Sequence, residues 1–544
     1  MAVASTGNAG ELIALGLQAA GTSHLFTLNG AHIWPLLTGS VEHGIRVIDT
    51  RHEQTATFAA EGWSKVTRQC GVAAVTAGPG VTNSVSAVAA AQANDSPLLL
   101  IGGRAPQARW GMGSLQELDH PAFLRSLTKS ASTLHSASDA YAVTSDAIAL
   151  ALAPRTGPVF FDVPFDTMLG TEDLPEKGPA PVPRGGAAPD PDQVGLAAAQ
   201  LREARRPVIV AGTGVWWAHG EAALIRLAEA VDAPVYTNGL ARGMLSPGHR
   251  LHRSRSRSSG VGEADLVILV GVPLDFRLNW GLPPLVNDQA RIVYIDVDDF
   301  RKHRPPAAAL YGDIALALDA LAEAARDTPR HPDWLQQLAT VEEAARERDR
   351  TLHEAGTHPI HPARLIAEVA RVLDPDAIVV GDGGDFVSFA GRLIERPGPG
   401  LFLDPGPFGC LGSGPGYAMA AKLAHPDRQV VLLSGDGAFG FGAIEFDTLV
   451  RHRINVVCVI GNNGIWATEK HPMQQFVGTA IATDLRPGTR YDRMVDALGG
   501  HGELVEQTRD VAPALHRALD AGVPSCINVL TDPGAEYPRS SVLM

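Results

Sequence analysis

The chain has 544 residues, of which 45% are hydrophobic and 19% charged, and its net charge is −14 at pH 7. At roughly 150 residues per domain, this length predicts three or four domains. The acidic balance argues against a nucleic-acid partner, since such binding needs basic surface. The four cysteines lie far apart in sequence, so we expect free thiols, a reducing compartment and a cytoplasmic protein. The apolar runs are too short to span a membrane, and the N-terminus lacks a basic targeting segment, so no membrane partner is expected.

Two breaks divide the chain. Residues 175–192 are rich in proline and poor in apolar side chains, which predicts an extended linker. A weaker break lies near 326–334 and is followed by a charged, helix-like stretch. We therefore predict domains at 1–170, 190–330 and 357–544.

Each predicted domain alternates short β-branched runs with Ala- and Leu-rich amphipathic stretches. This alternation is typical of parallel sheets covered by helices on both faces. The predicted fold class is α/β, with three doubly wound parallel-sheet domains. Residues 72–102 and 430–461 both read as strand, glycine turn, helix and strand, so the first and third domains are predicted to share a duplicated fold.

The strongest chemical signal lies in the third domain. Gly435-Asp436-Gly437 follows a predicted strand, and Asn462-Asn463 follows the next strand, with 24 residues between the two motifs. The carboxyl ends of parallel strands meet in one crevice, where a carboxylate and an amide oxygen suit Mg²⁺ and the helix-start N–H groups suit phosphate. Taken singly, Asp436 reads as a helix cap and Asn463 as a turn residue. Together, at this spacing, they predict a metal-bridged diphosphate site.

This pattern resembles the diphosphate-binding signature of thiamine diphosphate (ThDP) enzymes. The resemblance covers essentially the whole chain and is to the group containing acetolactate synthase, benzaldehyde lyase and 2-hydroxyacyl-CoA lyase. It implies a pyrimidine-binding, a middle and a diphosphate-binding domain, in that order. It also implies that the side chains of Asp436 and Asn463 and the carbonyl of Ile465 bind Mg²⁺.

The first domain supplies the other half of the resemblance. Glu53 stands between a predicted strand and an apolar helix, where alone it reads as a helix-start charge. The family match implies instead that it hydrogen-bonds the cofactor's aminopyrimidine ring and takes part in the proton transfer that activates the cofactor. The remaining cofactor-binding positions implied by the match are Gly78, Gly80, Asn83, Gly383, Gly384, Gly435, Gly437, Ala438, Gly464 and Ile465.

One position departs from the family pattern. Gly414 stands where the resemblance leads us to expect a bulky side chain beneath the bent cofactor. A glycine cannot hold two rings apart, so Pro415, Leu411 or another side chain is expected to replace it.

Three residues bear on the reaction. His32 follows Ala31 in a segment similar to one in benzaldehyde lyase, which implies a histidine facing the reacting carbonyl; the alternative is a turn histidine bonded to backbone. Gln116 lies in a segment similar to one whose glutamine faces the site in relatives. Trp466 matches a tryptophan of benzaldehyde lyase, with Ala31 a second residue of the substrate pocket, although a core role for Trp466 is equally compatible with the sequence.

The middle domain leaves its ligand open. Arg257 and Ser258 resemble a segment of the acyl-CoA lyases, whose middle domain binds adenine nucleotides, whereas acetolactate synthases hold FAD there. Pro273 stands where both groups usually have an arginine, which weakens either assignment. FAD or an adenine nucleotide therefore remains an open expectation.

The predicted function is that of a ThDP- and Mg²⁺-dependent carboligase or lyase acting on 2-hydroxyketones, similar to acetolactate synthase. The alternatives are a 2-hydroxyacyl-CoA lyase, a benzaldehyde-lyase-type acyloin lyase and, from another class, a non-catalytic regulatory homologue. Expected substrates are a 2-ketoacid, an aldehyde or a 2-hydroxyacyl-CoA. The resemblance implies a homodimer or homotetramer, because its sites are shared between subunits.

Overall fold

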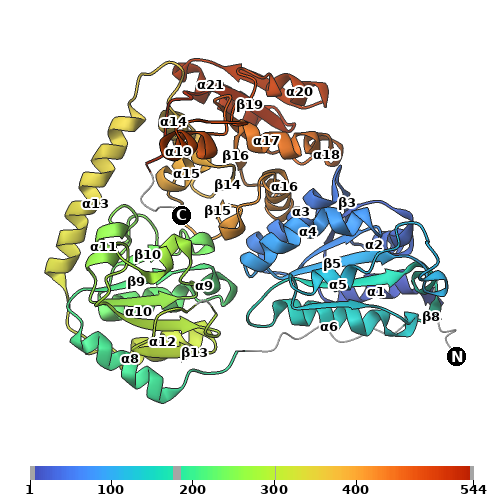
Figure 1. Ribbon diagram of the computed structural model, residues 1–544, viewed down its shortest axis with the longest axis horizontal. Helices are drawn as coiled ribbons and strands as arrows, with labels where there is room; N and C mark the ends of the chain where they lie inside the picture. The colour runs from blue at the N-terminus through green and yellow to red at the C-terminus, as the bar shows by residue number, and fades with distance from the viewer. Residues whose placement is uncertain (1–5, 175–185, 301, 539–544) are drawn as a thin grey trace.

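A computed structural model describes residues 6–174, 186–300 and 302–538, and it shows three α/β units in chain order (Figure 1). Each unit is built on its own parallel sheet with helices on both faces. The predicted fold class is thus confirmed. Much of the proline-rich linker predicted at 175–192 lies outside the described residues. The first five and the last six residues of the chain, which fall in the first and third predicted domains, also lie outside them. The predicted domain limits remain predictions.

The first sheet has six parallel strands. Successive side chains of its strands alternate between two buried layers: Leu98 and Leu100 enter one, Leu99 and Ile101 the other. A small antiparallel pair, β1 (Thr6–Asn8) and β8 (Thr171–Asp173), lies outside this sheet. In spatial order the strands are β3 (Arg46–Asp49), β2 (His24–Leu28), β4 (Gly71–Val75), β5 (Leu98–Arg104), β7 (Val159–Pro164) and β6 (Ser130–Thr133).

The helices of the first domain divide between the two layers. On one face lie α1 (Ala9–Ala19), α2 (Trp34–Glu42) and α6 (Ala140–Leu152). On the other lie α3 (Glu53–Thr67), α4 (Pro79–Ala93) and α5 (His120–Leu124).

The third sheet repeats the strand order of the first. If strands are counted within each domain, both sheets run 2-1-3-4-6-5. This identity of order confirms the predicted duplication. The strands are β15 (Phe402–Leu403), β14 (Ile378–Asp382), β16 (Val430–Gly435), β17 (Val457–Asn462), β19 (Ser525–Leu530) and β18 (His501–Val505).

Its helices also form two layers. One contains α14 (Pro362–Val372), α15 (Asp385–Leu393) and α21 (Thr508–Asp520). The other contains α16 (Gly414–Ala424), α17 (Asp436–Gly442), α18 (Phe446–His452) and α20 (Tyr491–Ala497), while α19 (Ala467–Val477) follows β17.

The middle domain has five parallel strands, β10 (Val235–Thr237), β9 (Pro207–Ala211), β11 (Leu266–Val270), β12 (Arg291–Asp296) and β13 (Ala308–Tyr311). Their 2-1-3-4-5 order is a common doubly wound arrangement. Helices α8 (Pro191–Glu203), α9 (Thr213–Trp217), α10 (Glu221–Val231) and α12 (Ile314–Ala324) cover one face and α11 (Arg257–Glu263) the other. The long helix α13 (Pro332–His353) leads from this domain to the third (Figure 1).

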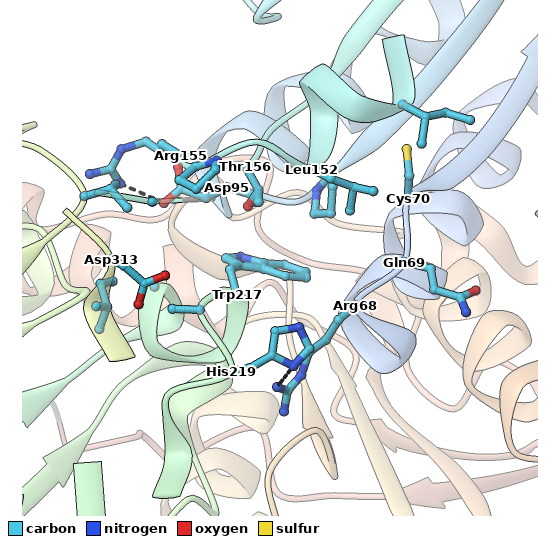
Figure 2. A pocket seen from close by; sticks show the side chains of 18 of the residues that line it. Arg68, Gln69, Cys70, Asp95, Leu152, Arg155, Thr156, Trp217, His219 and Asp313 are labelled. Atoms are coloured by element: carbon cyan, nitrogen blue, oxygen red, sulfur yellow. Dashed lines mark hydrogen bonds and ion pairs between the residues drawn. The ribbon is translucent and has the colours of Figure 1, made fainter. Parts of the chain in front are cut away.

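The first and middle domains enclose a cavity of about 450 Å³ (Figure 2). Arg68, Asp95 and Arg155 reach it from the first domain, and Trp217 and Asp313 from the middle domain. The cavity lies beside the ends of β9, β12 and β13, which is the edge where doubly wound sheets bind ligands.

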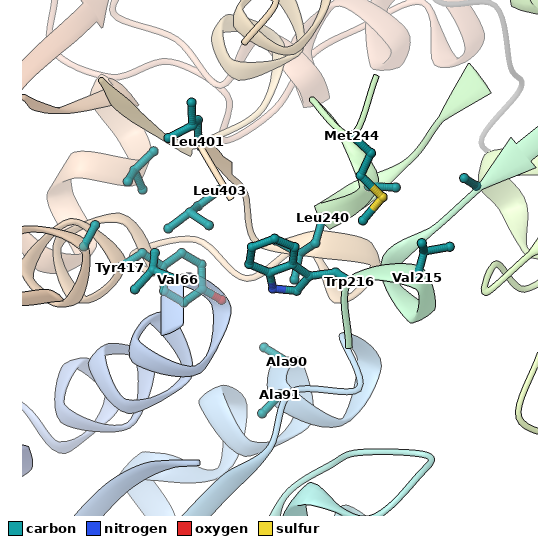
Figure 3. Close-up of a cluster of buried hydrophobic side chains, with 14 of the residues drawn as sticks. Val66, Ala90, Ala91, Val215, Trp216, Leu240, Met244, Leu401, Leu403 and Tyr417 are labelled. Carbon is teal, nitrogen blue, oxygen red and sulfur yellow. The ribbon is translucent and has the colours of Figure 1, made fainter. Parts of the chain in front are cut away.

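The three domains also share one apolar core. Trp216 of the middle domain belongs to the same buried cluster as Val66 of the first domain and Leu403 of the third (Figure 3). Close helix contacts complete the junction: a Cβ on Gly62 would lie 2.8 Å from the Cα of Tyr417, so α3 and α16 approach at backbone distance. This packing fixes the orientation of the helix that begins with Glu53.

None of the described helices is long and apolar enough to cross a membrane. The four cysteines are free. Cys70, Cys458 and Cys526 are buried, whereas Cys410 is partly exposed.

Candidate functional site

Three neighbouring strands of the third sheet bring the predicted diphosphate site together. Gly383 follows β14, Gly435 ends β16, and Asn463 follows β17. Gly383 has φ +136°, and a Cβ there would lie 3.2 Å from the backbone nitrogen of Gly435. Gly435 faces open space, with no heavy atom within 4 Å of its Cβ position. The backbone at this edge is therefore accessible to a phosphate group.

Asp436 begins α17 and is only 3% exposed. One carboxylate oxygen accepts from Gly464 N at 2.7 Å and the other from Gly437 N at 3.0 Å. Burial raises the pKa of this carboxyl group to about 6. Because each carboxylate oxygen carries two lone pairs, Asp436 can still bind a cation, and a cation would offset the cost of burying its charge.

The oxygen donors suit a magnesium ion. The Oδ1 atom of Asn463 accepts from Ile465 N at 3.1 Å and keeps a second lone pair. One carboxylate, one amide oxygen and one carbonyl form a sparse protein ligand set, which Mg²⁺ completes with substrate phosphates and water. Across the described part of the chain, no group of three or more His, Cys, Asp or Glu side chains could hold a metal. These residues fit an Mg²⁺–diphosphate group and do not form a closed metal cage.

The rest of the predicted set surrounds this edge. A Cβ on Gly437 would lie 2.4 Å from the ring of Trp466, so this tryptophan packs on the first turn of α17. A Cβ on Gly384 would lie 1.9 Å from Thr468 Oγ1. Ala438 lies within 3.6 Å of the Cβ position of Gly383, and Gly464 has φ +70°. Ala438, Gly464 and Ile465 therefore line the same edge as Asp436.

The structure explains why position 414 is a glycine. Its Cβ would lie 2.6 Å from Leu432 and 2.7 Å from Asp382. The buried Asp382 accepts hydrogen bonds from Gly412 N and Gly414 N, and burial raises its pKa to about 6. A bulky side chain does not fit at 414, and Leu411, three residues earlier in the chain, is half-buried.

Glu53 is the first residue of α3 and is 7% exposed. Its carboxylate accepts a hydrogen bond from Asn83 Nδ2 at 3.0 Å, a neutral partner on α4. Gly80, on the first turn of α4, lies 3.0 Å from Thr76 at its Cβ position. The helix start favours a carboxylate here.

His32 lies in the short 3-10 helix Ala31–Ile33 that follows β2, on the same edge of the first sheet. It is 7% exposed, and its Nδ1 is 3.1 Å from Thr76 Oγ1. The ring meets Phe165 edge-on, and burial, assisted by His120, lowers its pKa below 6.5. Ala31 is exposed beside it. His32 thus bonds to a side chain and also lies against Gly103, whose Cβ position is 2.3 Å from His32 Cβ, so its role in the reaction remains a prediction.

Gln116 has φ +60° and packs directly against Gly78, whose Cβ would lie 2.9 Å from that of Gln116. The following residue, Glu117, closes the loop by accepting from Gly111 N and Ser114 N. Gln116 therefore lies against the glycine turn that the sequence assigned to the pyrimidine site.

Comparisons with known proteins agree with this geometry. Residues 7–123 match the thiamine pyrophosphate enzyme N-terminal binding domain, residues 194–321 the central domain and residues 382–529 the C-terminal binding domain. The chain belongs to the thiamine pyrophosphate enzyme family. It is a ThDP-dependent enzyme, since thiamine pyrophosphate and thiamine diphosphate are the same compound.

Named relatives span the whole chain. A probable acetolactate synthase of Mycobacterium bovis and the acetolactate synthase large subunit IlvG of Mycobacterium tuberculosis are each 52% identical, over 100% of this chain and 99% of theirs. The human 2-hydroxyacyl-CoA lyase 2 is 35% identical, over 97% of this chain and 90% of its own. The chain is thus similar to proteins of both named activities, with higher identity to the synthases.

The predicted residues form two groups. One surrounds Asp436 in the third domain, and the other surrounds Glu53 and His32 in the first. Among the described residues, no hydrogen bond or ion pair joins the Glu53 carboxylate to the group around Asp436. Sequence reasoning missed the side-chain roles of Asp382 and Thr76. For Asp382 a signal existed, because it ends a strand between glycines, whereas nothing local marked Thr76.

Proposed function

We propose that this protein is a ThDP- and Mg²⁺-dependent carboligase or lyase that makes or breaks the carbon–carbon bond of 2-hydroxyketones, in the manner of an acetolactate synthase. The observation that carries the proposal is the pairing of two sheet edges in one chain. One edge offers oxygen ligands and open glycine backbone, and the other offers a buried carboxyl group beside a buried histidine. The 52% identity to acetolactate synthases supports the same reaction class.

In this proposal the third domain binds the diphosphate. Asp436, Asn463 and the carbonyl of Ile465 hold Mg²⁺, while the backbone around Gly383 and Gly435 approaches the cofactor. When bound, ThDP supplies the carbon nucleophile and stores the electrons released as the bond beside a carbonyl breaks. Leu411 is the residue we propose to support the cofactor's bent shape.

The first domain moves protons. Glu53, buried at the start of α3 with the neutral Asn83 as a partner, shares a proton with the aminopyrimidine ring. His32 stays neutral at physiological pH and can take or return a proton at the substrate oxygen. Gln116 donates a hydrogen bond to the substrate from the adjacent loop. A regulatory homologue would have no need of a buried Glu53, which argues against the non-catalytic alternative.

The middle domain bears on the acyl-CoA alternative. The basic run at 253–257 is engaged within the protein: Arg255 pairs with Asp349 at 3.2 Å and with Glu395, and Arg257 donates to Asn238 and to the Arg277 carbonyl. Glu342 further accepts from three successive backbone N–H groups of this run. These arginines are not free for a CoA phosphate, which favours 2-ketoacid or aldehyde substrates.

The interdomain cavity supports an adenine nucleotide. Asp296 and Asp313 lie at the carboxyl ends of neighbouring strands, the place where doubly wound sheets bind nucleotides. Arg68 and Arg155 also line the cavity, where Arg68 pairs with Glu221 and Arg155 with Asp95 and Asp296. Its volume of about 450 Å³ is near the lower end for small-molecule sites, which favours a nucleotide over the larger FAD.

Calorimetry with ADP and with FAD tests this ligand. Asp313→Asn keeps a cap for α12, because asparagine caps as well as aspartate, but it offers ribose hydroxyls a weaker acceptor. We expect ADP to bind and the variant to bind it more weakly. Binding of neither compound would contradict the assignment.

We also propose a dimer in which each site combines the first domain of one subunit with the third domain of its partner. Apolar side chains stand exposed near both half-sites: Met112 and Leu115 beside Gln116, and Phe441 beside Trp466. Such surfaces are typical of obligate interfaces.

Mixing two inactive proteins tests this arrangement. Glu53→Gln and Asp436→Ala subunits should form hybrids with one doubly defective and one intact site, and random twofold pairing restores about a quarter of wild-type activity. No recovery despite proven subunit exchange would mean that each site is built within one chain.

Product analysis tests the reaction itself. Purified protein with ThDP and Mg²⁺ is given pyruvate, an aromatic aldehyde or a 2-hydroxyacyl-CoA in separate reactions. We expect an acyloin or acetolactate from the first two donors. Cleavage of the acyl-CoA alone would favour the lyase alternative, and free aldehyde as the sole product from pyruvate would indicate a plain decarboxylase.

A further inference from the structure

A buried chain of hydrogen bonds crosses the edge of the first sheet. His120 and Asp162 are both fully buried, and neither belongs to the site described above. His120 Nδ1 is 2.8 Å from Asp162 Oδ2, and Arg104 donates to the same oxygen at 2.9 Å. At the other side of the ring, Gly78 N donates to His120 Nε2 at 2.9 Å.

These contacts fix the state of the ring. Because Nε2 accepts a backbone N–H, it carries no proton, so the proton lies on Nδ1 and is donated to Asp162. Asp162 is held by Arg104, whose guanidinium also stacks on Trp110 at 3.8 Å from the ring centre. The carboxylate therefore fixes the tautomer that lets His120 accept from Gly78.

Gly78 links this chain to the site. Its backbone, at φ +60° and ψ −111°, adopts a conformation that L side chains rarely reach. The turn packs against Gln116, which is itself in the left-handed region at φ +60°. Glycine adopts such a conformation without strain, whereas Gln116 does so at a cost and keeps it only because its surroundings hold it.

His32 packs against the same unit. Its Nδ1 bonds to Thr76, two residues before Gly78, and its Cβ lies 2.3 Å from the Cβ position of Gly103, next to Arg104. The side chains proposed to face the substrate from this domain therefore both contact segments that His120 and Arg104 hold in place.

We propose that His120 is a positioning residue: held by Asp162 and Arg104, it fixes the Gly78 turn through the Gly78 N–H and thereby sets Gln116 in the substrate pocket. The consequence for catalysis rests on the proposed function of Gln116. The effect of His120 on the conformation of the 107–118 loop does not depend on that proposed function.

Two substitutions separate the two bonds of His120. In His120→Gln the amide oxygen reaches the place of Nε2 and can still accept from Gly78. In His120→Asn the amide takes the place of Nδ1, which keeps Asp162 as partner and leaves the Gly78 N–H unpaired. We expect the Asn variant to lose at least about tenfold in kcat/KM, mainly in kcat, consistent with an orphaned buried donor. The Gln variant should stay within about threefold of wild type, because the Gly78 bond is conserved.

A second readout does not depend on activity. Arg109 lies exposed in the same loop, so trypsin cleavage there reports on its conformation. Cleavage should be faster in the Asn variant and unchanged in the Gln variant. If the wild type makes no acyloin, the proposed function fails, while the cleavage pattern still decides the role of His120.

Combination with Gln116→Ala shows whether His120 acts through Gln116. The double variant with His120→Asn should be no slower than Gln116→Ala alone, whereas additive losses would overturn the proposal. His24→Asn and His24→Gln are matched controls, because His24 lies at the opposite end of β2, and both should leave kcat/KM and cleavage unchanged.

A merely structural histidine gives a different pattern. Equal losses in the Asn and Gln variants, or unchanged cleavage at Arg109 in the Asn variant, would overturn the proposal. If the Asn variant does not fold, the Gln variant decides alone: a loss above about tenfold there, with the Gly78 acceptor kept, would refute the positioning role.

Discussion

The first and third domains share one strand order but place different chemistry at the same sheet edge. After the third strand of each sheet comes a glycine turn, Gly78-Pro79-Gly80 in one and Gly435-Asp436-Gly437 in the other. The middle residue is proline in the first and a metal-suited carboxylate in the third. A duplicated scaffold therefore supplies the same backbone turn twice, and we propose that single side chains determine whether that edge suits a charged diphosphate or proton transfer.

The comparison extends to what holds each edge in place. In the third domain, Asp382 fixes the turn at Gly412–Gly414 by accepting two backbone N–H groups. In the first domain, His120 performs the equivalent task for Gly78. A carboxylate and a neutral imidazole can both accept a hydrogen bond from a backbone N–H. Only the imidazole can also donate a hydrogen bond, and His120 donates it to Asp162.

The largest expected effect comes from Asp436→Ala, which tests whether the third-domain edge binds the metal. ThDP affinity in the presence of Mg²⁺ should fall more than about a hundredfold, beyond the usual loss for a residue outside the metal's own ligands. Calorimetry measures this ThDP affinity, and the substitution of an exposed aspartate, Asp376→Ala, serves as the control. Unchanged affinity would remove Asp436 from the metal site.

Glu53→Gln tests the opposite edge. We expect unchanged ThDP affinity and a loss of at least about a hundredfold in kcat, the scale of a positioned proton-transfer group. Proton exchange at the thiazolium carbon of bound cofactor should slow in parallel. Exchange at the wild-type rate would contradict the assignment, and the exposed Glu42→Gln should change neither quantity.

His32→Gln tests whether the first domain handles substrate protons. Because burial lowers the pKa of His32 below 6.5, the wild type should keep its neutral base as the pH falls below 6.5 and lose kcat/KM only at more acid pH. The kcat/KM of the variant should be about tenfold to a hundredfold lower at neutral pH and should not show this fall at acid pH.

The lowered pKa of His32 should also make the free energy of unfolding depend on pH. The unfolded state takes up a proton near pH 6.5 and the folded state does not, so the contribution of His32 is present above pH 6.5 and lost as the pH falls. Unfolding of wild type and His32→Gln, measured between pH 5 and pH 8, checks this. An identical pH dependence in both proteins would refute it.

The smallest expected effect concerns the junction of the first and third domains. Tyr417 donates to Glu61 at 2.6 Å and accepts from Lys65 at 3.0 Å, within a fully buried cluster between α3 and α16. Tyr417→Phe should lower the free energy of unfolding by about 1–3 kcal/mol, because two buried polar groups each lose a partner. Denaturant unfolding measures the loss, and kcat should stay near that of wild type. A large fall in kcat at unchanged stability would show that this cluster serves the site.

The sequence alone determined the architecture and predicted the two centres of the site. The alternation of β-branched runs with amphipathic stretches can be read from neighbouring residues, and it predicted three parallel sheets. The motifs Gly-Asp-Gly and Asn-Asn, each at the end of a predicted strand, predicted that Asp436 and Asn463 lie on one edge of a sheet. The duplication was readable because the same turn recurred at the same point of each unit.

Only the tertiary structure decided how these edges are supported. His120, Asp162 and Thr76 carry no local signal, because each acts through a partner 42 or more residues away along the chain. The small residue at 414 was likewise explained only by the neighbouring strand and by Asp382, which occupy the space of a side chain. Such restraints depend on which strand ends lie side by side, and that order arises only when the sheet has assembled.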